Sequence, residues 1–288
     1  MSAVFRHEMA SYFTGLSAFV FGTFVLLFGG IYTMAYNIVG GFANFEFVMN
    51  AISFIFIIIV PIITMRVLAE EKRQKTDQLL YSLPISMTNV VLGKFLAMLI
   101  VFAIPVGILC IYPVILGRFG NVSFASSYSA VLGFFLLGAS LLAIGMFISS
   151  LTESQAVAAG ICFVVMLLNY FVSDISDYVP TTPMASVIAF TVIIIIIALI
   201  FRFMTKNNFA SIVLGAVLEI ILLILYVLKS GLFEGLFANV IGKLSLFERF
   251  YIFIDGVFDL TGIVYFVSVI ALFLFLSIQS MEKRRWSE

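Results

Sequence analysis

Repeated apolar runs of about 20 residues constrain this 288-residue chain more than any other feature. Hydrophobic residues make up 63% of the sequence and charged residues only 10%, whereas an average soluble domain has about 25% charged residues. A helix formed by such a run can cross the roughly 30 Å hydrocarbon core of a bilayer. Eight such runs cannot all be buried in a soluble domain of this size. The sequence therefore predicts an all-α, polytopic helical membrane protein.

The distribution of Lys and Arg predicts the orientation of these helices. With the N-terminus inside, eleven of the fifteen basic residues lie on the cytoplasmic side and four lie outside. Eight spans with both termini in the cytoplasm preserve this bias, and removing one span would destroy it. The expected transmembrane helices are 16–38, 47–66, 89–116, 126–149, 155–173, 185–203, 209–228 and 260–280. Pro61, Pro105 and Pro113 fall inside spans and are expected to kink them.

The longest break in the apolar pattern runs from residue 66 to residue 88, and we call it the coupling segment. Six charged residues fall between Glu70 and Asp77, so this stretch must lie at a membrane surface. Leu79, Leu80 and Leu83 follow on or near one side of a short predicted helix that ends at Pro84. Ser86 or Thr88 can then cap the next helix.

Three stretches resemble permeases of the ABC-2 transporter family, especially its GldF-like branch. The first includes Ala69-Glu70-Glu71-Lys72-Arg73, Thr76, Leu79-Leu80, Ser82, Pro84 and Leu92-Gly93-Lys94-Phe95. The second, Phe5-Arg6-His7-Glu8 to Tyr12-Phe13-Thr14, is similar to the amphipathic elbow helix of that family. The third runs from Leu246-Phe247-Glu248-Arg249-Phe250 through Asp255-Gly256-Val257 to Glu282-Lys283-Arg284-Arg285-Trp286.

The resemblance implies one permease domain over residues 1–288. Its parts would be an interfacial elbow helix (1–14), the coupling segment, an extra helical hairpin (185–228) and external amphipathic helices (230–258). Such a permease pairs with a second permease chain, identical or paralogous, in the plasma (inner) membrane, here expected to be bacterial. Export of an amphiphilic or lipid-like substrate is the expected activity, driven by a separate ABC ATPase subunit. The lipid bilayer is the other expected partner, and nothing suggests nucleic-acid binding.

A phosphate-binding loop of the form G-x-x-x-x-G-K-[ST] is missing from the sequence. The nearest candidates, Gly93-Lys94 and Gly242-Lys243, are followed by Phe95 and Leu244. We therefore expect that the chain is not an enzyme by itself and binds no cofactor, and that ATP and Mg²⁺ bind to the partner ATPase. A metal site is not expected either, because the only histidine is His7 and the two cysteines lie inside apolar runs.

The resemblance implies that the coupling segment contacts the ATPase. The expected contacts are Glu70, Glu71, Arg73, Asp77, Leu79, Leu80, Leu83 and Pro84, with a minor contact from Glu153 in the turn between the fourth and fifth spans. A charge run can also be a solvated loop without a partner. The turn at Glu153 can equally be a plain connection in which Thr152 caps the next helix.

Glu219 is an ionisable residue near the middle of the seventh span. Such residues are costly in a membrane and usually mark functional sites, so Glu219 is a candidate for binding a cationic group or a proton. It can also be a protonated, hydrogen-bonded packing residue. If Glu219 carries the function, the chain is an ion-coupled secondary transporter or a channel. A third alternative is a membrane scaffold that binds partners without nucleotide-linked transport.

Overall fold

The computed structural model describes residues 1–76, 86–178, 180–205 and 208–287, and every regular element in this part of the chain is a helix. The helices form two compact units. Unit 1 contains Met1–Tyr170 and Arg249–Glu288, and unit 2 contains Phe171–Glu248. Each unit is described by itself.

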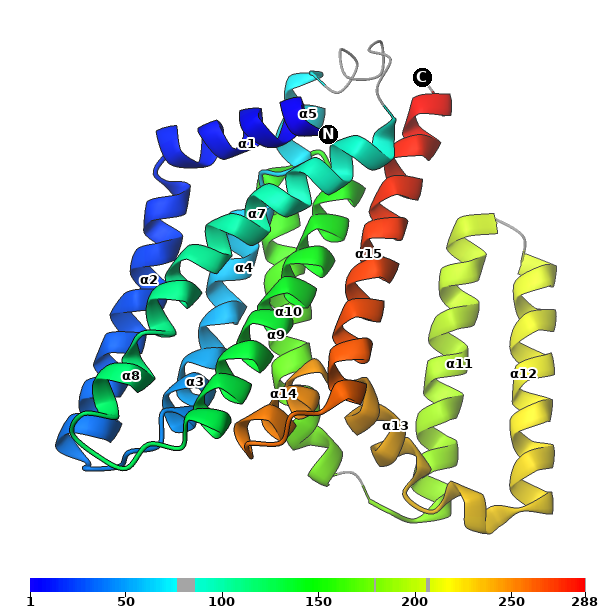
Figure 1. Cartoon of the computed structure of the whole chain (residues 1–288). Helices are drawn as coiled ribbons and strands as arrows, with labels where there is room; N and C mark the ends of the chain where they lie inside the picture. The colour runs from blue at the N-terminus through cyan, green and yellow to red at the C-terminus, as the bar shows by residue number, and fades with distance from the viewer. Residues whose placement is uncertain (77–85, 179, 206–207, 288) are drawn as a thin grey trace. The chain divides into compact units, whose positions relative to one another are not determined.

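Unit 1 is a bundle of long helices with one helix lying across its end (Figure 1). The crossing helix is α1 (Ser2–Thr14), which lies at the same end as α5 and the C-terminal end of α15. We call this the α5 end of unit 1. The other elements that begin in unit 1 are α2 (Ser17–Tyr32), the π-helix η1 (Thr33–Val39), α3 (Glu46–Ile52), the 3-10 helix η2 (Ser53–Ile55), α4 (Phe56–Thr64), α5 (Ala69–Gln74), α7 (Met87–Leu109), α8 (Tyr112–Leu116), α9 (Phe124–Leu151), α10 (Gln155–Tyr178) and α15 (Leu260–Ser287).

Helix α9 is the most deeply buried long helix of unit 1, and it packs against α3, α4, α7 and α15. Small residues allow this close packing. A Cβ on Gly138 would collide with the ring of Phe102 and come within 2.9 Å of Phe56. The rings of Phe56 and Phe134 lie 4.6 Å apart, and that of Phe102 lies 5.7 Å from Phe56. These tilted and edge-on aromatic contacts form the apolar centre of the bundle.

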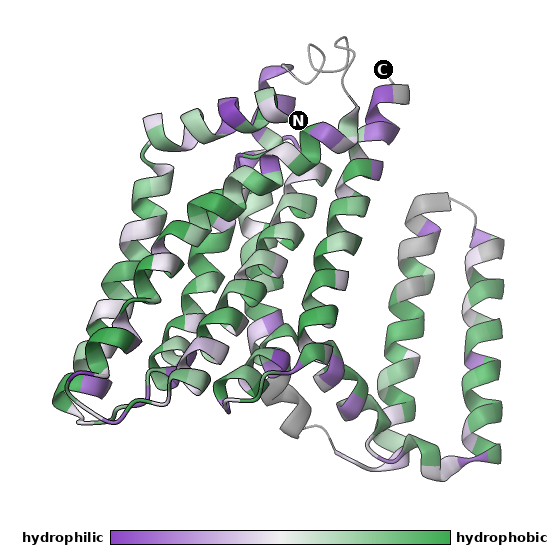
Figure 2. Cartoon of the chain, in the orientation of Figure 1, coloured by the Kyte–Doolittle hydropathy of each residue, from purple (hydrophilic) through white to green (hydrophobic). Residues whose placement is uncertain are grey.

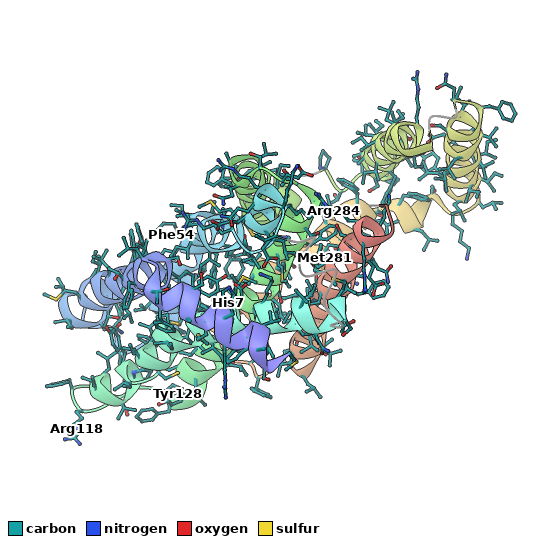
Figure 3. The ribbon with its side chains drawn as sticks, turned by 90° about the horizontal axis from the view of Figure 1, so that it is seen from above. His7, Phe54, Arg118, Tyr128, Met281 and Arg284 are labelled. Atoms are coloured by element: carbon teal, nitrogen blue, oxygen red, sulfur yellow. The ribbon has the colours of Figure 1, made fainter. Side chains whose placement is uncertain are left out.

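At the α5 end, α1 packs across α7 next to Gly93, where a Cβ would lie 3.3 Å from the Met1 carbonyl oxygen. Hydrophilic residues concentrate along this end, while the middle parts of the unit 1 helices are hydrophobic (Figure 2). The view onto this end shows His7 on α1 and Arg284 on α15 (Figure 3). This distribution is the one expected of helices whose central parts cross hydrocarbon.

The spans agree with most of the sequence prediction. Among the described residues, seven helical stretches are long and apolar enough to cross a membrane. They are Ser17–Val39, Glu46–Gln74, Met87–Leu116, Phe124–Leu151, Gln155–Val172, Ser211–Leu228 and Leu260–Arg285. The remaining predicted span, 185–203, falls in α11, whose described apolar part is the shorter Pro183–Ile196. The all-α polytopic class is confirmed, and the count of eight stays a prediction.

Capping residues and prolines in the sequence predicted several helix ends and kinks. Ser86, one of the two predicted caps, is the N-cap of α7. Its hydroxyl accepts a hydrogen bond from the Asn89 amide at 3.4 Å. Pro61 and Pro105 lie inside α4 and α7. Pro113 lies in the first turn of α8, so the chain breaks between α7 and α8, where a kink was expected.

Unit 2 contains an antiparallel pair, α11 (Pro183–Thr205) and α12 (Asn208–Leu228), followed by η3 (Ser230–Phe233) and α13 (Leu236–Leu244). Helix α14 (Leu246–Ile254) carries the chain into unit 1. Helix α13 lies against α11: the Phe237 amide donates to the Ser186 hydroxyl at 3.3 Å, and the rings of Phe190 and Phe237 lie 5.4 Å apart. The predicted external stretch, 230–258, thus contains two short helices, α13 and α14.

Candidate functional site

Helix α5 lies in the coupling segment and is fixed at both ends. At its start, the Ser149 hydroxyl oxygen on α9 accepts hydrogen bonds from the amides of Leu68 at 3.2 Å and Ala69 at 3.1 Å. Amides at the start of a helix have no acceptor within the helix, so Ser149 supplies one from a neighbouring element. At its other end, Lys75 adopts a left-handed conformation with φ of 55°, and its amide bonds back to helix carbonyls. The helix therefore has a defined start and stop.

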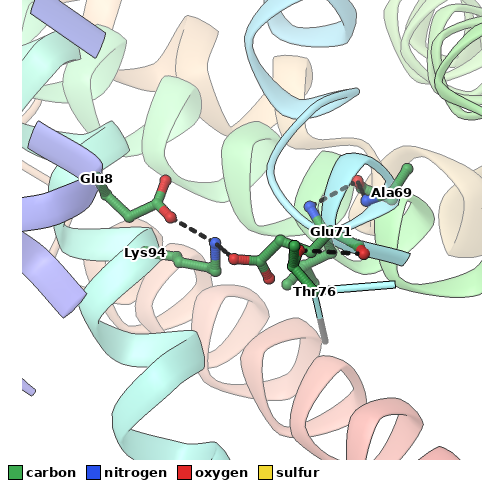
Figure 4. Close-up of polar contacts among 7 residues, drawn as sticks. Glu8, Ala69, Glu71, Thr76 and Lys94 are labelled. Atoms are coloured by element: carbon green, nitrogen blue, oxygen red, sulfur yellow. Dashed lines mark hydrogen bonds and ion pairs between the residues drawn. The ribbon is translucent and has the colours of Figure 1, made fainter. Parts of the chain in front are cut away.

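Lys94 on α7 bridges carboxylates from two other helices (Figure 4). Its Nζ atom lies 2.5 Å from Oε1 of Glu8 on α1 and 2.8 Å from Oε1 of Glu71 on α5. The Lys94 side chain is only 2% exposed, and those of Glu8 and Glu71 are 14% and 22% exposed. A buried cation is stable only when it is paired and hydrogen-bonded. The ion pairs therefore compensate Lys94 and fasten α5 to α1 and α7.

A second set of bonds fastens α5 to α9 and α15. The buried Lys72 side chain donates from Nζ to the backbone carbonyl of Ser150, near the end of α9. The hydroxyl of Ser280 on α15 donates to the same carbonyl at 3.1 Å. Just beyond, Nη1 of Arg284 lies 2.8 Å from Oε1 of Glu153. One backbone oxygen is thus shared between α5 and α15.

We call Glu8, Glu71, Lys72, Lys94, Ser149 and Ser150 the α5 network. It connects α5 with α1, α7, α9 and α15 at one end of unit 1. Buried ion pairs and hydrogen bonds of this kind resist rearrangement, because breaking one leaves a buried polar group without its partner. The network therefore attaches α5 to α1, α7 and α9 and, through the Ser150 carbonyl, to α15.

A polar cavity of about 670 Å³ adjoins the ion pairs of Lys94. Residues of α1, of the turn that leads into α5, of α5 itself and of α7 line it, among them His7, Glu8, Arg66, Glu70, Glu71 and Lys94. Tyr12 also lines it. Burial raises the pKa of the Tyr12 hydroxyl far above its usual range, and the nearby Glu8 carboxylate raises it further. Tyr12 is therefore a neutral group on the cavity wall.

The described residues of the predicted contact set lie on or near this end. Glu71 belongs to the α5 network, whereas the Glu70 carboxylate accepts from Gln74 of the same helix at 3.2 Å. Arg73 is exposed on α5, and Glu153 contacts Arg284. The ATPase-contacting role of these residues stays a prediction. The predicted contacts Asp77, Leu79, Leu80, Leu83 and Pro84 lie outside the described residues.

In the turn at Glu153, Thr152 bonds to an amide that precedes α10, whereas the capping alternative has Thr152 cap that helix. Thr152 Oγ1 accepts from the Ser154 amide at 3.1 Å, within the turn that precedes α10. The hydroxyl thus orders the connection between α9 and α10. Glu153 is exposed on this turn and pairs with Arg284 of α15, so the contact links α15 to the turn that follows α9.

Only Glu71 of the six residues in the α5 network belongs to the predicted contact set; Glu8, Lys72, Lys94, Ser149 and Ser150 do not. Glu8 and Lys94, which are 86 positions apart, occur in the sequence argument only as parts of two resembling stretches. Their charge at the edges of apolar runs was a usable signal, because a lysine inside a predicted span requires a partner. Ser149 gave no such signal, since serine residues are common between packed membrane helices.

Glu219 lies in unit 2, at the centre of the apolar stretch Ser211–Leu228 of α12. Its Oε1 atom accepts a hydrogen bond from the Thr191 hydroxyl of α11 at 2.8 Å. Both residues line a groove of about 390 Å³ between α11 and α12. The hydrogen-bonded arrangement fits either of the two roles weighed for Glu219, because a packing residue and a binding residue would both accept this bond.

The described residues contain no group of three or more His, Cys, Asp or Glu side chains that could hold a metal ion. Among the described residues of unit 1, buried ion pairs and polar side chains gather in the α5 network and around the adjoining cavity. This arrangement of one buried lysine, two carboxylates and capped backbone groups is suited to joining helices.

The comparison with protein families identifies the chain. The sequence model described as "ABC-2 family transporter protein" matches residues 31–184, which is more than half of the chain. The matched region contains α5, Lys94, Ser149 and Glu153, while Glu8 and Glu219 lie outside it. No curated protein matches the chain. Members of this family are the membrane components of ABC transporters and work with ATPase subunits. The chain therefore belongs to the ABC-2 transporter family and is a multi-pass membrane permease of that class.

Proposed function

We propose that the chain is an exporter permease whose coupling segment, residues 66–88, receives a separate ABC ATPase in the cytoplasm. The ATPase would bind ATP and Mg²⁺, and a second permease chain would complete the transport path. The proposal also places the chain in the GldF-like branch and in a bacterial plasma membrane. The family match favours this function over an ion-coupled transporter and over a scaffold.

The attachment of α5 to four other helices carries this proposal. Lys94 links α5 to α1 and α7, and the bonds of Lys72 and Ser149 link it to α9. The carbonyl that Lys72 contacts also holds α15. A surface that transmits a conformational change from a partner must be bonded to the helices that move. The α5 network meets this requirement, because its bonds are buried and come from helices far apart in sequence.

Docking is tested by co-purification with a candidate ATPase in detergent. The test variant changes Leu79, Leu80 and Leu83 to Asp, which would remove the apolar anchors of an amphipathic contact. A matched control changes three exposed apolar residues of the predicted external stretch to Asp: Leu232, Val240 and Leu244. We expect the wild type and the control to retain the ATPase and the test variant to lose it, with both variants giving the wild-type elution volume. Retention of the ATPase by the test variant contradicts docking through this segment.

Transmission is tested separately from docking. Glu71→Gln removes a charged bond between α5 and α7, whereas Glu70→Gln is the same chemical change on the neighbouring residue, whose described bond stays within α5. We expect both variants to bind the ATPase. We expect permease-stimulated ATP hydrolysis, measured in reconstituted complexes, to fall in Glu71→Gln and to be kept in Glu70→Gln. Equal effects of the two substitutions would show that the α5 network has no special part in coupling.

A further inference from the structure

The groove between α11 and α12 contains a carboxylate at the centre of an apolar span. Glu219 lies eight residues from the start and nine from the end of Ser211–Leu228, so it is about 12 Å along the helix axis from the nearer end. The groove has a volume of about 390 Å³, and most of its lining is apolar, from residues such as Ile195, Leu199 and Ile212. Its centre is therefore a charge-bearing position surrounded by hydrocarbon side chains.

Two hydrogen bonds join α11 and α12 beside this groove. The Thr191 hydroxyl donates to Glu219 at 2.8 Å, and the Ser211 hydroxyl donates to the Ala198 carbonyl at 2.5 Å. Small side chains leave the space between these contacts. A Cβ on Gly215 would lie 3.3 Å from that of Ala198, so the backbones approach closely there. The groove therefore results from fixed contacts and from residue size.

The described residues use only part of the hydrogen-bonding capacity of the Glu219 carboxyl group. Thr191 is a neutral donor and occupies one acceptor position of a carboxylate that has about four. Arg202 is the cation that lines the same groove. It lies eleven residues beyond Thr191 on α11, or about 16 Å along the helix, which is too far for a direct pair with Glu219. An ionised carboxylate in apolar surroundings needs a cation close to it.

We propose that this groove binds a lipophilic amine, with the ammonium group on Glu219 and the alkyl chain along the apolar walls. Ammonium supplies the missing charge and hydrogen-bond donors, and an alkyl chain fits the remaining lining. The inference is independent of ATPase docking, because the groove lies within α11 and α12 and its occupancy is measured at equilibrium. Failure of one proposal leaves the other standing.

The test compares dodecylamine with dodecanol, which have the same chain and differ in charge. Binding to the purified full-length protein is titrated by native mass spectrometry at neutral pH. We expect the amine to bind at least about ten-fold more tightly than the alcohol, since a hydrogen bond to a charged group is worth this much. Equal binding of the two compounds would overturn the proposal.

Substitutions locate the site. Glu219→Gln keeps an acceptor for Thr191 and should abolish the preference for the amine, while Glu219→Asp keeps the charge and should retain a preference. Glu234→Gln is the matched control, because Glu234 is exposed in the same unit and does not line the groove. Ala216→Leu should weaken both ligands by filling the groove. A preference that survives Glu219→Gln, or is lost equally in Glu234→Gln, overturns the assignment, as does unchanged binding of both ligands in Ala216→Leu.

Discussion

Removing the two carboxylates around Lys94 should reveal a strongly non-additive loss of stability. The site holds one cation and two anions, with Nζ 2.5 Å from Glu8 and 2.8 Å from Glu71. Glu8→Gln or Glu71→Gln alone leaves Lys94 with one carboxylate and a balanced charge. The double variant leaves a lysine that is 2% exposed without any carboxylate in this cluster. The second substitution should therefore cost far more than the first.

The magnitudes follow from the geometry. Each single change replaces an ion pair by a hydrogen bond from the Lys94 ammonium to a neutral amide oxygen, which costs about 1 kcal/mol. Leaving a buried charge without its partner costs about 3–5 kcal/mol. The double variant should then be less stable than the sum of the single variants by about 1–3 kcal/mol, the range expected for residues in one network.

The assay is reversible unfolding in mixed micelles, followed by circular dichroism as the SDS fraction rises. Wild type, both single variants and the double variant form a thermodynamic cycle, and Glu70→Gln serves as the control outside the ion pairs. An additive result would refute the argument, because it would mean that each carboxylate acts on Lys94 independently. A double variant as stable as the wild type would show that the cluster does not hold the helices together.

Three further predictions concern packing, capping and pH. Gly138→Ala should cost about 1–3 kcal/mol by overpacking the aromatic centre, whereas Gly160→Ala should be neutral or stabilising, since nothing lies within 4 Å of the added atom. Ser149→Ala should cost about 1 kcal/mol, because two amides at the start of α5 lose their acceptor, and Ser268→Ala should cost less, since that hydroxyl bonds only within its own helix among the described residues. Burial raises the pKa of the Tyr12 hydroxyl, so the unfolded chain loses this proton at a lower pH than the folded protein. The free energy of unfolding should therefore fall as the pH rises above about 10, the ordinary tyrosine pKa. The Tyr12→Phe substitution should reduce that fall.

The same unfolding assay checks all three, and hydrogen exchange of the α5 amides adds a local measure for the capping serine. Equal losses in the two glycine variants would contradict the packing argument. Unchanged exchange at α5 in Ser149→Ala would show that water replaces the lost acceptor at no cost. A wild type and a Tyr12→Phe variant with the same alkaline profile would mean that Tyr12 is ionisable in the folded state.

The sequence was most informative where a residue's chemistry excludes an environment. The charges from Glu70 to Lys75 could not lie in hydrocarbon, and the structure places Glu70 to Arg73 on α5, at the end of the long apolar stretch Glu46–Gln74. Ser86 could be identified as a candidate cap because it follows Pro84 and precedes an apolar run. Both inferences need only local sequence, and the cap at Ser86 is confirmed.

The α5 network could not be derived in the same way. Lys94 and Glu8 meet because α1 crosses α7 at Gly93, and no local pattern determines that crossing. Ser149 resembles other serines of α9, and only the position of α5 makes its hydroxyl a cap. The packing of α9 at the centre of unit 1 likewise depends on a contact between distant segments, in which Gly138 lies against the ring of Phe102. Tertiary contacts between distant segments determine all three features.

The order of the ion pairs along the chain bears on how the protein is made. Synthesis proceeds from the N-terminus, so Glu8 and Glu71 both leave the ribosome before Lys94. When α7 enters the bilayer with its lysine, the two carboxylates that neutralise the charge have already been made on earlier segments. A lysine at the centre of a membrane helix raises the free energy of insertion by about 2.5–3.5 kcal/mol, which is an upper bound for Lys94 because it lies near the start of α7. Here the nascent chain carries the counter-charges ahead of the cation.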